Sequence, residues 1–128
     1  MTQNGSDGFY NGFGPKERKG ALAAIRAAIA DGFVPSPTSC SVCGVCPDYT
    51  LGFHGEDYRR PLAAYAICRG CHVRVHARFR NPDRWREHIS CLDPSGWFQS
   101  LSVDPRSLTR PFDETYPGGS LRSLAHED

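Results

Sequence analysis

Two Cys-x-x-Cys steps constrain the fold of this chain more than any other feature of its sequence. Cys40 and Cys43 form the first step, and Cys68 and Cys71 form the second. Two such steps separated by a short loop-and-strand segment have the spacing of a four-thiolate zinc site. A tetrahedral shell of four thiolates leaves no open position, so we predict a structural zinc ion there.

Other uses of the six cysteines stay open. A disulfide framework is disfavoured, because the N-terminus carries no apolar segment typical of a secretion signal and because a Cys-x-x-Cys step closes poorly on itself. We therefore expect reduced thiols and a cytoplasmic location. Cys46 continues the even spacing of Cys40 and Cys43, and Pro47 follows it, which resembles part of an iron–sulfur run. We interpret Cys46 as a spare thiol or a substitute for Cys43, and Cys91 as a buried core thiol.

Length, composition and the helix and strand patterns given below predict one small α+β domain, stabilised by zinc, between two flexible arms. The 128 residues are 39% hydrophobic, which allows one modest core. Residues 1–14 are rich in Gly, Asn and Ser, and residues 102–128 have no apolar period, so we predict that both arms are disordered or order only on a partner. The folded domain is then residues 15–101. No apolar run approaches the ~20 residues that span a bilayer, so a membrane partner is not expected.

Within this domain, sequence patterns predict helices around a short hairpin. Residues 15–31 are typical of a helix, because Pro15 suits the first helical position and Gly32 suits the position just past the end. The segment that includes Trp97, Phe98 and Leu101 is expected to fold back onto the core. The other predicted elements are two strands and two further helices, at about residues 50–54, 62–67, 71–80 and 82–90.

Three histidines form the second chemical signal. His72 and His76 lie four positions apart, on one face of a predicted helix, where two imidazoles can bind one metal ion. His54 lies on the first predicted strand, and a hairpin packed on that helix would bring it close. The three would form an open site, with positions left for water and phosphate. His88 and His126 have no other histidine at such a spacing, and we interpret them as surface residues.

The formal net charge of +1 hides a basic stretch. Between residues 54 and 87 there are eight arginines and four acidic residues. Arginine forks suit phosphate oxygens, so an arginine-rich face beside a metal site indicates a nucleic-acid surface. The alternative is a solvated helix face with local ion pairs. The arginines predicted to bind nucleic acid are Arg69, Arg74, Arg78 and Arg80.

The segment from Cys40 to His76 resembles the HNH nuclease family, of the ββα-metal type with an added four-cysteine zinc knuckle. The residues that carry the resemblance are Cys40-x-x-Cys43-Gly44, His54-Gly55-Glu56-Asp57-Tyr58, Pro61-Leu62, Cys68-x-x-Cys71-His72 and His76. The resemblance implies an HNH-like core, with structural zinc on the four cysteines. It also implies a second, catalytic divalent metal (Mg²⁺, Mn²⁺, Ni²⁺ or Zn²⁺) on His54, His72 and His76. The implied activity is metal-dependent endonucleolytic hydrolysis of phosphodiester bonds, with DNA as the expected partner.

The sequence departs from the family pattern at the general base. Gly55 stands where the base histidine usually follows the hairpin ligand, and Ala63 stands where a polar residue often orients that base. Three explanations stay open. Glu56 replaces the base, His54 itself acts as the base, or the chain no longer cuts and only binds.

Three functions are consistent with these observations. The first is an HNH-like endonuclease, with weakened or lost activity if the base is missing. The second is a non-catalytic zinc module that binds nucleic acid. The third is a protein-interaction module, in which zinc stabilises the scaffold and the arms recognise a protein partner. The first differs from the others in requiring a second metal ion on the histidines.

Overall fold

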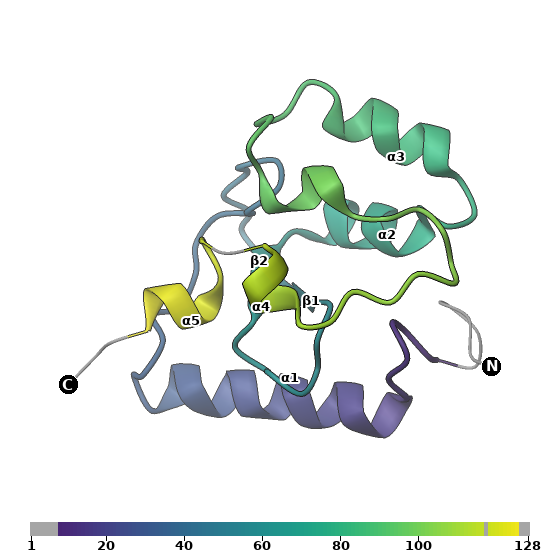
Figure 1. Ribbon diagram of the computed structural model, residues 1–128. Helices are drawn as coiled ribbons and strands as arrows, with labels where there is room; N and C mark the ends of the chain where they lie inside the picture. The colour runs from purple at the N-terminus through teal and green to yellow at the C-terminus, as the bar shows by residue number, and fades with distance from the viewer. Residues whose placement is uncertain (1–7, 117, 126–128) are drawn as a thin grey trace.

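The computed structural model describes residues 8–116 and 118–125, and these residues form a small α+β fold. Figure 1 shows α1 along one side of the molecule, α2 and α3 on the opposite side, and the hairpin of β1 and β2 between them. No helix among the described residues has the length and apolar character needed to cross a membrane. The elements in chain order are α1 (Pro15–Ala30), β1 (Gly52–Gly55), β2 (Ala64–Ile67), α2 (Arg69–Ala77), α3 (Pro82–Ile89), the 3-10 helix η1 (Trp97–Ser100), α4 (Phe112–Thr115) and α5 (Leu121–Leu124).

Helix α1 begins and ends where its sequence predicts. Pro15 occupies the first turn, and the Glu17 carboxylate accepts a hydrogen bond from the backbone N–H of Gly14 at 2.9 Å. This bond satisfies one of the free N–H groups at the helix start. Gly32, with φ at +78°, follows the last turn, and glycine adopts this conformation without steric cost. The predicted helix over residues 15–31 is therefore confirmed to within one residue.

Strands β1 and β2 pair in antiparallel register, with Phe53 opposite Ala66 and His54 opposite Tyr65. Each strand has four residues and begins two residues later than its predicted counterpart. The turn between them is held by Asp57, whose carboxylate accepts hydrogen bonds from Arg59 Nε at 2.9 Å and Nη2 at 3.0 Å. The hairpin therefore has a fixed connection and presents His54 on a buried face.

Helix α2 follows β2 directly, with Cys68 as its N-cap. The Cys68 sulfur accepts a hydrogen bond from the backbone N–H of Cys71 at 3.5 Å. This cap starts the helix two residues before its predicted beginning. Helix α3 has Pro82 in its first turn and buries Trp85 and Ile89. Both helices lie on the side of the hairpin opposite α1 (Figure 1).

Two hydrophobic clusters form the core. The larger one joins the hairpin, α2, α3, η1 and α4, and it includes Phe98 and Leu101, as the sequence predicts. The smaller one joins α1 to β2 and α5 through Ile25, Ala64 and Leu121. The hairpin therefore has one cluster on each side, and its position fixes the histidine that it carries.

Parts of both predicted arms pack against the domain, so the packed part of the chain extends beyond residues 15 and 101. Tyr10 is 2% exposed and Phe112 is 0% exposed. The Asn11 side chain donates to the Thr109 carbonyl and accepts from the Thr109 N–H, each at 2.7 Å. These two bonds join the segments on either side of the domain. The prediction of flexible arms extends also over residues 1–7, 117 and 126–128, which lie outside the described residues.

Candidate functional site

The four cysteines of the two Cys-x-x-Cys steps come together. Their sulfur atoms all lie within 4.8 Å of one another, and Cys43 Sγ is 3.8 Å from Cys68 Sγ. The first pair lies in a tight turn in which Gly44, at φ +79°, donates its N–H to the Cys40 carbonyl at 2.9 Å. Cys68 follows the last residue of β2, and Cys71 lies in the first turn of α2. A turn, a strand end and a helix start therefore meet at one cluster that can hold a metal ion.

The electrostatics of this cluster favour a bound cation. A hydrogen bond from the Cys71 thiol lowers the pKa of Cys40 to about 4. The same interaction raises the pKa of Cys71, and burial raises the pKa of Cys43. The Cys40 sulfur is thus negative while Cys43 and Cys71 hold their protons, because close thiolates repel one another. A divalent cation removes this repulsion and stabilises all four as thiolates.

The structure places the remaining cysteines and histidines as follows. Cys46 and Cys91 are exposed, so the prediction that Cys91 is a buried core thiol is wrong. It lies just past the end of α3, where the chain turns along the surface. His88 is half-buried, and its Nε2 is 3.3 Å from Cys71 Sγ. The prediction that His88 is a surface residue missed this contact, because it joins two helices. His126 lies outside the described residues.

The three histidines of the second predicted site also meet. His54 comes from β1, and His72 and His76 come from α2. One ring nitrogen of each lies within 4.8 Å of the others, and the Nε2 atoms of His72 and His76 are 3.1 Å apart. His54 is 0% exposed, whereas the α2 pair is half-buried. The pair on the helix therefore forms the accessible side of the cluster.

A buried hydrogen-bond network fixes His54 from behind. Its Nε2 is 2.7 Å from Glu56 Oε2, and the Tyr10 hydroxyl donates to the same carboxylate oxygen. Arg78 donates from Nη1 to the Tyr10 hydroxyl at 2.8 Å, and its Nη2 lies 3.6 Å from Glu56 Oε1. Trp97 stacks on the imidazole with ring centroids 5.8 Å apart. The orientation of the His54 ring is therefore set by its surroundings.

This network leaves one nitrogen of His54 without a partner. In the tautomer that donates Nε2–H to Glu56, the lone pair is on Nδ1, and Nδ1 is buried with no hydrogen-bond partner. A histidine that binds a metal through one nitrogen usually donates its other N–H to a carboxylate or a carbonyl. The pairing of His54 with Glu56 has this form. An orphaned lone pair beside two further imidazoles therefore fits a metal ligand.

The charge states are also those of a ligand set. Burial lowers the pKa of His54, His72 and His76, and neighbouring cationic groups lower each of them further. The imidazoles are therefore neutral at physiological pH and keep the lone pairs that a divalent cation needs. Burial raises the pKa of Glu56 to about 7, against the opposing effects of Arg78 and of the hydrogen bond from Tyr10.

The backbone explains the glycine beside His54. A Cβ atom at Gly55 would lie 3.0 Å from the carbonyl oxygen of Ala63, the residue just before β2. Ala63 itself is 2% exposed. A side chain at position 55 would require the Ala63 carbonyl to move by a few tenths of an ångström. A base histidine at this position would therefore need a small local shift of the backbone.

Three of the four arginines predicted to bind nucleic acid are exposed, and one is not. Arg69 and Arg80 line a shallow groove that passes over His72 and His76 and has a volume of about 550 Å³. Arg74 lines an adjoining groove on the outer face of α2. Arg78 is 2% exposed and bonds to Tyr10 and to two backbone carbonyls. In this structure Arg78 is not available to a nucleic acid, because it faces the buried network behind His54.

The structure adds two residues that sequence reasoning missed. Tyr10 comes from the predicted flexible arm, and no periodicity marks it as a core residue. Arg18, on α1, lines the same groove as His72 and His76. Four consecutive charged residues, 16–19, open this helix, and the sequence gives no signal for which of them faces a site formed by another element.

Comparison with known proteins identifies no relative, since no family model, no curated protein and no solved structure matches this chain.

Proposed function

We propose that this chain is an HNH-like, metal-dependent endonuclease that hydrolyses phosphodiester bonds in DNA. One observation carries the proposal. His54, His72 and His76 converge from a hairpin and a following helix, and the two helical histidines line a groove that arginines also line. This combination pairs a candidate metal centre with a surface for phosphate. The four cysteines hold a structural zinc ion in this proposal.

The three imidazoles are the proposed ligands of a second divalent cation. Such a cation, when bound, would supply charge stabilisation for a phosphodiester and would lower the pKa of a coordinated water molecule. His72 and His76 are held four positions apart on α2, and His54 is held by the hairpin. Their half-open arrangement leaves room on the side of the groove, as a catalytic site requires.

Glu56 has a positioning role in this proposal. Its carboxylate is 1–2% exposed and contacts His54, so it orients the ring and fixes the tautomer. His54 is equally buried. Because neither side chain meets solvent, we assign neither of them the task of taking a proton from water. Slow hydrolysis is expected, because Gly55 offers no side chain beside them.

Arg69 and Arg80 are the proposed phosphate contacts. Both are exposed and line the groove over the α2 histidines. Guanidinium groups bind phosphate oxygens bidentately and place the strand against the ligand set. Binding should weaken steeply as salt rises, because each phosphate contact releases counterions.

The test is nicking of supercoiled plasmid by purified protein with Mg²⁺, Mn²⁺, Ni²⁺ or Zn²⁺. We expect metal-dependent nicking that His76→Ala abolishes and that Glu87→Ala, an exposed change on α3, leaves intact. Zinc content is measured in each variant, and an unchanged value in His76→Ala shows that the cysteine cluster and the fold persist. The absence of metal-dependent nicking above the His76→Ala background would refute the proposed endonuclease activity.

The second candidate function is a non-catalytic zinc module that binds nucleic acid. The close contact between position 55 and the Ala63 carbonyl favours it, because this contact disfavours a base side chain there. The module would bind DNA with strong salt dependence, lose affinity in Arg69→Glu and Arg80→Glu, and cut nothing. The plasmid assay combined with a gel-shift assay separates the two functions.

A further inference from the structure

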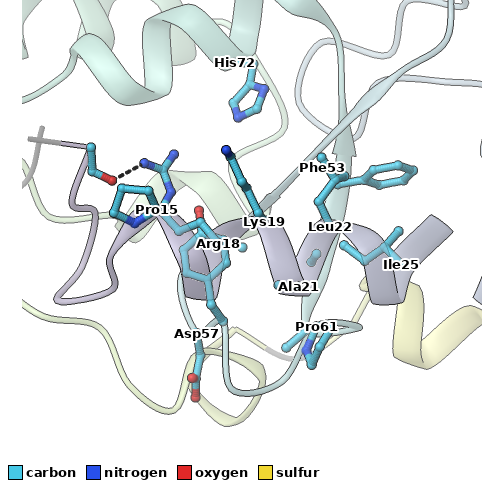
Figure 2. A pocket seen from close by; sticks show the side chains of 15 residues that line it. Pro15, Arg18, Lys19, Ala21, Leu22, Ile25, Phe53, Asp57, Pro61 and His72 are labelled. Atoms are coloured by element: carbon cyan, nitrogen blue, oxygen red, sulfur yellow. Dashed lines mark hydrogen bonds between the residues drawn. The ribbon is translucent and has the colours of Figure 1, made fainter. Parts of the chain in front are cut away.

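A pocket separates α1 from the hairpin next to the histidine cluster (Figure 2). Its volume is about 330 Å³, within the roughly 300–1,000 Å³ that small-molecule sites occupy. The wall contributed by α1, β1 and the segment leading into β2 is apolar. The residues that form this wall are Ala21, Leu22, Ile25, Phe53, Ala63 and Ala64.

The mouth of the pocket is positively charged. Arg18 and Lys19 of α1 line it together with His72 of α2, and Figure 2 shows Lys19 and His72 pointing toward one another. Arg18 donates from Nη1 to the Gly8 carbonyl at 2.7 Å, but its Nε is buried and has no hydrogen-bond partner. A buried donor of this kind is costly unless a ligand accepts from it.

The acidic residue that lines the pocket does not balance this charge. Asp57 is already engaged, because its carboxylate accepts from Arg59 Nε and Nη2. The mouth therefore has a positive potential, which favours an anionic ligand.

The pocket and the groove over the histidines adjoin one another. Arg18 and His72 line both of them. A ligand whose phosphate lies at Arg18 would therefore face the proposed metal centre on one side and the apolar wall on the other. A nucleotide has this form, with a charged phosphate next to a planar base. Phe53 offers an aromatic side chain for base stacking.

We propose that α1 and the hairpin bind one unpaired nucleotide of the substrate strand, with its phosphate at Arg18 and Lys19 and its base on the apolar wall. This inference rests on the proposed function and specifies the substrate class as single-stranded or locally unpaired nucleic acid. A base inside a duplex would have to leave its stack to enter the pocket. Arg18 is then a phosphate-binding residue supplied from outside the hairpin and α2.

The test is binding to the zinc-loaded full chain, without a second metal, of thymidine monophosphate, thymidine and inorganic phosphate. We expect the nucleotide to bind about ten-fold more tightly than either fragment. Chemical-shift changes should map to Leu22, Phe53 and Ala64. Arg18→Gln should weaken nucleotide binding by about ten-fold or more, because it removes a charge-assisted hydrogen bond. The matched control is Arg26→Gln on the same helix, which does not line this pocket.

Two outcomes overturn the proposal. Equal affinity for the nucleotide and inorganic phosphate would leave an anion site without a base pocket. Shift changes confined to α3 or to the outer face of α2 would place the nucleotide elsewhere, and this measurement on the unmodified chain does not depend on any variant folding. Because nucleotide binding is measured without the second metal, the absence of plasmid nicking would not change the conclusion about the nucleotide pocket. Likewise, the absence of nucleotide binding would not change the conclusion drawn from plasmid nicking.

Discussion

Tyr10 connects three groups behind the histidine cluster. Its hydroxyl donates to Glu56 and accepts from Arg78, and burial raises its pKa well above the usual value, so it stays protonated. We expect Tyr10→Phe to lower the free energy of unfolding by about 1–3 kcal/mol, because it leaves buried charged groups with an unmet bond. Urea unfolding measures the change. Tyr116→Phe removes an exposed bond to the Ser100 carbonyl and should cost less than about 0.5 kcal/mol. Equal losses in the two variants would contradict this role.

His88 is the residue-scale test of the cysteine cluster. Its Nε2 lies 3.3 Å from Cys71 Sγ, in position to donate to the thiolate that zinc binding would create. Groups around the ligands of a metal contribute about 10–100-fold to affinity. We expect His88→Ala to weaken zinc binding within that range, measured by competition with a chromogenic chelator. The neighbouring Glu87→Ala should leave zinc affinity unchanged. A wild-type affinity in His88→Ala would show that the contact does not support the metal.

At the scale of elements, the effect of the close contact within the hairpin on stability can be compared with that of a glycine in α1 that has open space around it. A Cβ at Gly55 would press on the Ala63 carbonyl at 3.0 Å, whereas a Cβ at Gly20 meets nothing within 4 Å. We expect Gly55→Ala to destabilise the fold by about 1–3 kcal/mol, as overpacking does. Gly20→Ala should stabilise it by about 0.4–1 kcal/mol, because alanine is the better helix former. The two changes are chemically identical, so effects of the same sign would contradict the packing argument.

Local sequence signals predicted the helices and the ligand clusters well, because each of these features depends on residues that are close together in the sequence. Pro15 and Gly32 limit α1, and the Cys-x-x-Cys and His-x-x-x-His spacings define both ligand clusters. The start of α2 was placed too late because the Cys68 sulfur serves as its cap. Arg78 was assigned to the surface because composition counts an arginine without showing which way it faces. The buried network that holds it forms only in the folded chain.

At the scale of the whole molecule, the two segments outside residues 15–101 contribute to the core and to the site. Asn11 and Thr109 bind each other across 98 positions of sequence. Phe13 is 5% exposed and Leu121 is 1% exposed. Single buried residues in segments without periodicity give no sequence signal, since their partners are far away along the chain. For that reason the sequence gives no sign of these particular contacts.

Deletion of residues 102–128 tests how far the domain depends on its C-terminal segment. Phe112 is fully buried in the larger cluster, beside Tyr65 at a ring-centroid distance of 5.5 Å. The deletion would open that cluster and the α1 cluster together, so we expect loss of cooperative thermal unfolding. Phe112→Ala isolates one part of this effect and should cost about 3–5 kcal/mol. Leu108→Ala, at a side chain that is 48% exposed, should change stability by less than about 0.5 kcal/mol. A truncated chain that kept the full melting temperature would restore the boundary at residue 101, and Tyr10 would then hold the histidine site without help from the opposite end.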